Sequence, residues 1–95
     1  MKLGGNIELE GFDNLEPAQL VVIKKIVGSS AKKIAEEIAK FDNLLITLKE
    51  NEKDKATLTG KITINGNDHE AEASDKNLFF ALNMILNELT TKIKQ

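Results

Sequence analysis

The side chains that could support catalysis or bind a metal offer few combinations. The chain has a single histidine, His69, which lies between Asp68 and Glu70. A zinc site needs several nitrogen or sulfur ligands, and the sequence has neither a second histidine nor a cysteine to supply them. The absence of cysteine also excludes a disulfide framework and a thiol nucleophile. We therefore expect no metal, no cofactor and no catalytic residue.

Carboxylates form a second set of reactive groups, and they alternate with apolar residues in two short segments. These carboxylates are Glu8, Glu10, Glu70 and Glu72. The alternation predicts two strands, and we expect those strands on opposite sides of a sheet. The carboxylates then do not converge on one site, and they indicate edge protection and solubility.

Lysine supplies all thirteen basic side chains, and the net charge is −2. That sign is wrong for a protein whose whole surface binds phosphate, so any nucleic-acid site must be local. Four lysines do gather in the middle of the first predicted helix: Lys24, Lys25, Lys32 and Lys33. They could contact phosphates. They could equally form a solvated helix face, because Lys32 can pair with Glu36, and Lys33 with Glu37, four residues later.

Phe80 and Met84 form an apolar pair one turn apart in the last predicted helix. They lie about 160–200° from the centre of the apolar stripe of that helix, so both should point toward water. One interpretation is a partner surface, a homodimer contact or a place where a nucleobase stacks on Phe80. The other is isolated surface apolarity, or coverage by the charged segment 51–55.

Two amphipathic helices are predicted to position these residues. The last helix, over residues 74–95, has an apolar stripe with Leu82 and Ile85 near its centre, and we expect Ser74 to cap its first turn. A longer helix begins near Glu16 and continues to about Phe41. Its apolar spacing of three and four residues passes unbroken through residues 28–30, which predicts one continuous helix.

Alternating apolar residues predict four strands, over residues 7–10, 44–49, 56–64 and 70–73, with residues 1–5 as a lead-in. The predicted fold is α+β, with two layers in the order β-α-β-β-β-α. We expect a four-stranded mixed sheet in which the first two strands are parallel and the last three form an antiparallel meander, with both helices packed on one face. A stripe of small residues on the first helix should face the last helix: Gly28, Ala31, Ala35 and Ala39.

The chain length is typical of one domain, which we assign to residues 1–95. The first thirty residues show no basic start followed by an apolar core, and nowhere do eighteen apolar residues run together. We therefore expect a cytoplasmic protein and no membrane partner.

Several segments, in this order and spacing, resemble the ribosome hibernation-promoting factor family, also called ribosome-associated inhibitor or protein Y. They are Ile7-Glu8-Leu9-Glu10-Gly11, the helix from Glu16, the threonine-rich strand from Ala56 to Ile64, the Asn65-Gly66 hairpin, and the run from Ala71 to Leu82. In that run a strand of small residues leads into a helix start with Asp75, Phe79 and Ala81. The resemblance spans nearly the whole chain.

The resemblance implies a non-enzymatic protein that occupies the decoding region of the small ribosomal subunit, blocks messenger and transfer RNA, and stabilises idle ribosomes. It implies contact with ribosomal RNA through basic residues on both helices. The matching candidates here are Lys24, Lys25, Lys32, Lys33, Lys76 and Lys92. This sequence departs from the family pattern because it has no arginine, the residue best suited to bidentate phosphate contacts.

Two other interpretations stay open. The first is a regulatory or protein-interaction module of the same fold that has lost ribosomal RNA binding and uses Phe80 and Met84 for a protein partner. Acidity and the missing arginine favour it. The second is a double-stranded RNA binding domain, which also packs helices on a sheet; the leading strand over residues 7–11 and the sparse basic residues argue against it.

Overall fold

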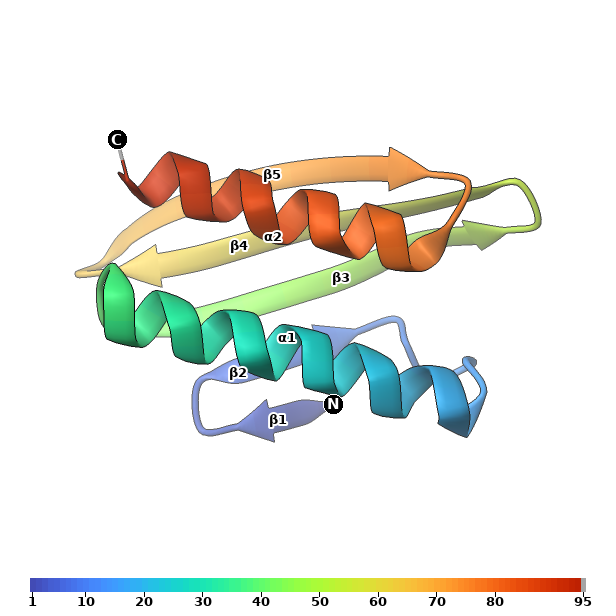
Figure 1. The fold of residues 1–95 in the computed structure, drawn as a ribbon, viewed down its shortest axis with the longest axis horizontal. Helices are drawn as coiled ribbons and strands as arrows, with labels where there is room; N and C mark the ends of the chain where they lie inside the picture. The colour runs from blue at the N-terminus through green and yellow to red at the C-terminus, as the bar shows by residue number, and fades with distance from the viewer. Residues whose placement is uncertain (95) are drawn as a thin grey trace.

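The computed structural model describes residues 1–94, and within them it contains five strands and two helices (Figure 1). In chain order these are β1 (Lys2–Gly4), β2 (Ile7–Glu10), α1 (Pro17–Glu37), β3 (Asn43–Glu52), β4 (Lys55–Ile64), β5 (Asn67–Asp75) and α2 (Leu78–Lys94). The α+β class predicted from the sequence is confirmed. α1 is continuous through Gly28, also as predicted.

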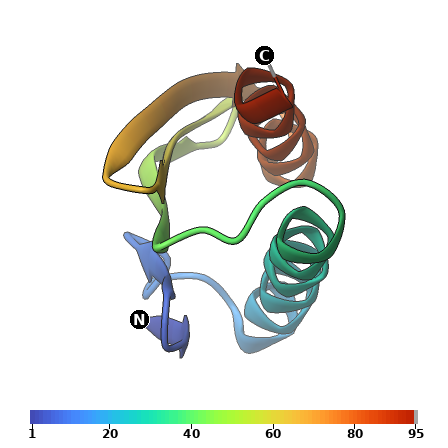
Figure 2. The same cartoon turned by 90° about the vertical axis from the view of Figure 1, so that its left-hand side faces the viewer.

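The strands form one mixed sheet in the order β1-β2-β3-β4-β5. β2 and β3 are parallel and are connected by α1, whereas β3, β4 and β5 form an antiparallel meander. Both helices lie on the same side of this curved sheet, α1 nearer β2 and α2 nearer β5 (Figure 2). The other side of the sheet is therefore left without a helical layer.

The prediction of four strands is wrong, because residues 2–4 form a fifth. β1 pairs with β2 in an antiparallel hairpin. The backbone N–H of Leu9 donates to the carbonyl of Met1 at 2.7 Å, and the terminal amine of Met1 donates to the carbonyl of Leu9 at 2.9 Å. Three residues ending in a glycine are too short to show the alternation on which a strand prediction depends.

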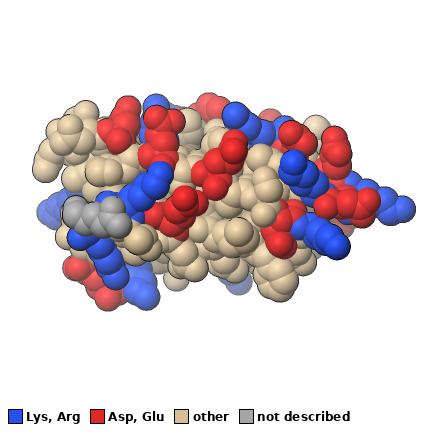
Figure 3. Space-filling model, turned by 90° about the horizontal axis from the view of Figure 1, so that it is seen from above, with Lys and Arg blue, Asp and Glu red and all other residues tan. Residues whose placement is uncertain are grey.

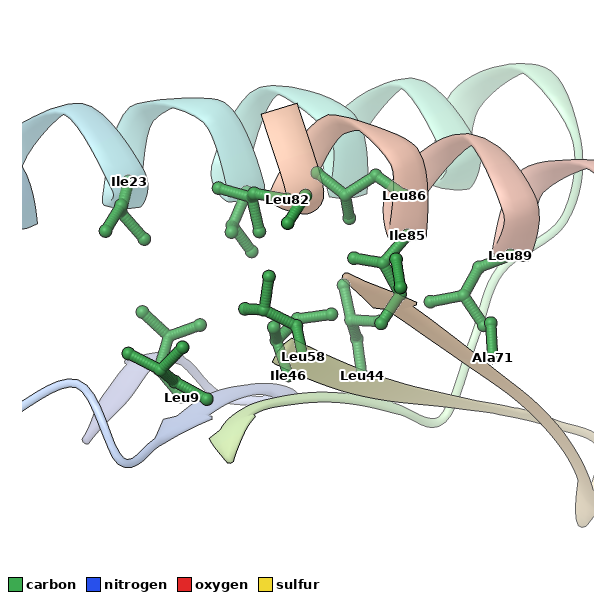
Figure 4. Close-up of a cluster of buried hydrophobic side chains, with 14 of the residues drawn as sticks. Leu9, Ile23, Leu44, Ile46, Leu58, Ala71, Leu82, Ile85, Leu86 and Leu89 are labelled. Atoms are coloured by element: carbon green, nitrogen blue, oxygen red, sulfur yellow. The ribbon is translucent and has the colours of Figure 1, made fainter. Parts of the chain in front are cut away.

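The core fills the space between the sheet and the helices (Figure 4). One row across the sheet runs from Leu9 through Ile46 and Gly60 to Ala71, and all four residues are buried. A Cβ at Gly60 would lie 2.9 Å from the Cδ1 of Leu89, closer than real side chains come. Glycine at this position therefore lets α2 approach the middle of the sheet.

The sequence predicted that α1 continues to about Phe41, but the helix ends at Glu37. The carbonyl of Ile34 accepts from both Ile38 and Ala39 at 3.0 Å, and this pair of bonds closes the helix. Phe41 lies in the connection to β3 and is only 8% exposed. The spacing of Phe41 from the apolar residues of α1 fits a helix, because Phe41 packs into the same core although its backbone is no longer helical.

Ser74 does not cap α2, contrary to the prediction. β5 extends to Asp75, and the Oγ of Ser74 lies 2.9 Å from the Oγ1 of Thr57 on β4. Asn77 takes the capping role, since its Oδ1 accepts from the N–H groups of Phe79 at 2.8 Å and Phe80 at 3.2 Å. Ser74 therefore belongs to β5 and pairs with β4, and it does not cap α2.

The stripe of small residues on α1 does not face α2, so that prediction is also wrong. A Cβ at Gly28 would meet nothing within 4 Å, and Ala35 is exposed. α1 instead turns Ser30, Lys33 and Glu37 toward α2. A groove of about 450 Å³ separates these ends of the two helices, so no close backbone approach requires small residues there. Neither helix, over the described part of the chain, is long and apolar enough to cross a membrane.

Candidate nucleic-acid interface

The four lysines of α1 are all exposed, but they do not share one face. Each residue turns a helix by about 100°, so nine residues place Lys24 and Lys33 on opposite sides of α1. Seven residues bring Lys25 and Lys32 to within about 20° of each other, on the side facing away from buried Val27. We call Lys25 and Lys32 the ridge lysines, because they stand together on the outer crest of α1.

Lys33 belongs to a different feature, the inter-helix groove. Residues of both helices line this groove: Ser30, Lys33, Ile34, Glu37 and Ile38 from α1, and Leu86, Asn87, Thr90, Thr91 and Lys94 from α2. Lys33 and Lys94 bring two positive charges to its wall, against one carboxylate from Glu37. The sequence interpretation named Lys92 among the RNA-binding candidates and missed Lys94, because only the packing of the helices shows which lysine of the last turn faces α1.

The hydroxyl groups in the groove limit what it can bind. The Oγ1 of Thr90 donates to the carbonyl of Leu86 at 2.8 Å, and the Oγ1 of Thr91 donates to the carbonyl of Asn87 at 3.0 Å. Both hydroxyl protons are already used, so the threonines present lone pairs to the groove. The positive charge for a phosphate there would come from the amines of Lys33 and Lys94.

The two lysines predicted around α2 lie far from each other along the helix. Lys76 is exposed in the turn that precedes α2, while Lys92 lies in its last turn. The Nζ of Lys92 donates to the backbone carbonyl of Glu70 on β5. Lys92 thus faces the edge of the sheet and not the groove, and the structure does not bring it together with the lysines of α1.

Phe80 and Met84 are exposed, as predicted, with 62% and 48% of their surfaces accessible. At such exposure the segment 51–55 does not cover them. Val21 and Val22 on α1 are also large exposed apolar residues, at 54% and 44%, and the sequence interpretation did not single them out. Their angular position, well outside the stripe through Ile23 and Val27, was the available signal.

The acidic residues do not gather into a metal or acid–base site. β3 and β4 separate β2 from β5, so the carboxylates of the two strands lie apart, as predicted. The Oγ1 of Thr63 donates to the Oδ1 of Asp68 at 2.7 Å, next to His69. In residues 1–94 no group of three or more histidine and carboxylate side chains could hold a metal ion.

No protein-family model and no curated protein matches this sequence. Solved structures do match the fold. A ribosomal subunit interface protein from Coxiella burnetii superposes with a TM-score of 0.71, covering 94% of this chain and 93% of that one at 15% identity. The N-terminal domain of Protein Y from Thermus thermophilus gives a TM-score of 0.62, covering 93% and 92% at 15% identity. Over nearly its whole length, this chain therefore has the fold of the protein Y family that its sequence resembles.

Proposed function

We propose that this protein binds the small ribosomal subunit and restrains translation, without catalysing a reaction. The observation that carries the proposal is the fold shared with the ribosomal subunit interface protein over 94% of this chain. The exposed lysines of α1 support it, because they supply local positive charge in a chain of net charge −2. Such a protein would work in the cytoplasm, where ribosomes are.

In this proposal the lysines act as point charges on RNA phosphates. A lysine amine has three rotatable donors and no rigid fork, so it contacts a phosphate without fixing its orientation. The ridge lysines Lys25 and Lys32 form one contact region on the crest of α1. Lys33 and Lys94 form a second one in the inter-helix groove. A domain held in the decoding region by these contacts would exclude messenger and transfer RNA by occupying their space.

Sedimentation through a sucrose gradient tests the proposal. The purified protein should travel with purified small subunits at low salt, and prior loading of messenger and transfer RNA should reduce the bound fraction. The double variant K25Q/K32Q should bind less. Its matched control is K53Q/K55Q, which removes the same charge from exposed lysines at the β3–β4 turn. Protein that remains at the top of the gradient at low salt contradicts the proposal.

The exposure of Phe80 and Met84 favours a second candidate, a protein-interaction module that keeps this fold without binding ribosomal RNA. Adjacent large apolar side chains in water are typical of a partner surface. The double variant F80S/M84S should then lose the partner while the ridge variant K25Q/K32Q keeps it. A monomeric protein whose every interaction survives F80S/M84S would rule this candidate out.

A further inference from the structure

β5 is a long strand at the edge of the sheet, so its backbone groups that point away from β4 have no strand to pair with. It has nine residues and pairs with β4 alone. The carbonyl of Glu70 accepts from Lys92, so the backbone of Glu70 points away from β4. Backbone direction alternates along a strand, so the N–H and C=O groups of Asp68 and Glu72 also point outward. Such a row of unpaired groups is a template for one more strand.

The side chains along this edge are acidic on the face of the sheet away from the helices. Ala71 and Ala73 are buried beneath the helical layer, so by alternation Asp68, Glu70 and Glu72 lie on the other face, where all three are exposed. Their partners on β4 are Thr63, Lys61 and Thr59, which bring one lysine to three carboxylates. Figure 3 looks onto this part of the molecule and shows acidic side chains along it with lysines between them.

One side of α2 overhangs the same edge. Lys92 identifies that side, because its amine reaches β5. Residues four and eight positions earlier, Glu88 and Met84, follow at steps of about 40° around the helix and so share it. We call Met84, Glu88 and Lys92 the α2 flank. Met84 is 48% exposed, so this flank offers apolar surface beside the open edge.

We propose that the β5 edge and the α2 flank bind an extended segment of a partner protein, in which lysines alternate with apolar residues, by adding it to the sheet as a sixth strand. Lysines on one face of the added strand would meet Glu70 and Glu72, and apolar residues on the other face would meet Met84. Strand addition of this kind takes affinity from main-chain hydrogen bonds and specificity from alternate side chains. This site is separate from the ridge lysines and does not depend on the proposed ribosomal function.

The charges exclude a second copy of this chain as the occupant. Pairing β5 with itself would place carboxylates against carboxylates, and like charges directly opposite each other destabilise a strand pair. A lysine-bearing strand reverses the sign of that interaction. Lys92 already places one amine on the outward carbonyl of Glu70, so the partner must displace it.

A nine-residue peptide of alternating lysine and valine, blocked at both ends, tests the proposal by fluorescence anisotropy. E70Q/E72Q should weaken its binding about fivefold, since each removed charge pair contributes a modest amount at the surface. The matched control E8Q/E10Q removes two glutamates from β2, which β3 and β4 separate from β5, and it should leave the affinity unchanged. M84S should weaken binding, and K92M should strengthen it because the competing amine is gone.

A second peptide separates strand addition from charge attraction. Methylating every backbone nitrogen of the peptide keeps every lysine charge but removes all of its backbone donors, so this peptide should not bind. In hydrogen exchange, the amides of Asp68, Glu70 and Glu72 should become protected by the unmethylated peptide alone. Equal binding of the two peptides, or equal weakening by E8Q/E10Q and E70Q/E72Q, would overturn the proposal.

Discussion

Lysine is the only source of positive charge in this protein, and that choice shapes every contact its surface can make. An arginine would present a rigid fork to a phosphate or carboxylate, whereas a lysine amine presents a compact, strongly hydrated charge on a flexible stem. The amine of Lys92 shows this behaviour, since it reaches a backbone carbonyl on a neighbouring strand. Contacts made by Lys25, Lys32 or Lys33 would depend on charge and proximity more than on a fixed geometry.

The capping residue of α2 gives a prediction for a single side chain. N77A should lower the free energy of unfolding by about 1 kcal/mol, because the N–H groups of Phe79 and Phe80 lose their acceptor. N77D should keep most of the stability, since a carboxylate also accepts these bonds and suits the positive end of the helix dipole. Urea denaturation monitored by circular dichroism measures both.

The control for this cap is N83A, on the exposed face of the same helix. It should leave stability unchanged or raise it slightly, because alanine has the higher helix propensity. If N77A and N83A have the same effect, Asn77 does not cap α2.

At the scale of elements, the sequence predicts α1, α2 and the four longer strands because each has a strong apolar period. The predicted boundaries of these elements are wrong where one residue suits two different elements. Ser74 suits a helix cap, yet the pairing of β5 with β4 extends through it to Asp75. β1 is missed because its pairing depends on hydrogen bonds between Met1 and Leu9, which no alternation reveals.

The site is less predictable than the fold, because it depends on how α1 and α2 are oriented about their own axes. The apolar period shows which residues point toward the sheet, but not which side of α1 faces α2. Adjacent Lys32 and Lys33 therefore looked like one cluster, whereas only Lys33 lines the inter-helix groove. The same limit explains why Lys92 was chosen over Lys94.

The connection between α1 and β3 gives a prediction at this scale. F41A should destabilise the protein by about 3–5 kcal/mol, because Phe41 is 8% exposed and closes the core from outside the helix. F80A removes the same side chain from a position that is 62% exposed, and should change stability by less than about 0.5 kcal/mol. Chemical denaturation of the two variants compares them directly, and equal losses would place Phe41 outside the core.

Across the whole molecule, positive and negative side chains gather in different places, although the net charge is only −2. The ridge lysines lie on α1, which packs near the β2 end of the sheet, while the acidic side chains of β5 lie at the opposite edge of the sheet. A net charge of −2 gives no general attraction to RNA, so an RNA partner would have to bind at the ridge lysines. A basic protein segment would bind at the β5 edge. The two proposed partners could therefore bind at the same time.

The salt dependence of ribosome binding tests this separation. If Lys25, Lys32, Lys33 and Lys94 each neutralise one phosphate, the logarithm of the affinity should fall with the logarithm of salt concentration with a slope of roughly −3 to −4. K25Q/K32Q should make the slope shallower by about 1.5–2, because two phosphate contacts are lost. E70Q/E72Q should leave it unchanged, although it shifts the net charge of the whole molecule by the same amount in the opposite direction. Titrations of small subunits at several salt concentrations give the three slopes. Slope changes of equal size and opposite sign from the two variants would mean that net charge, and not the ridge of α1, governs the interaction.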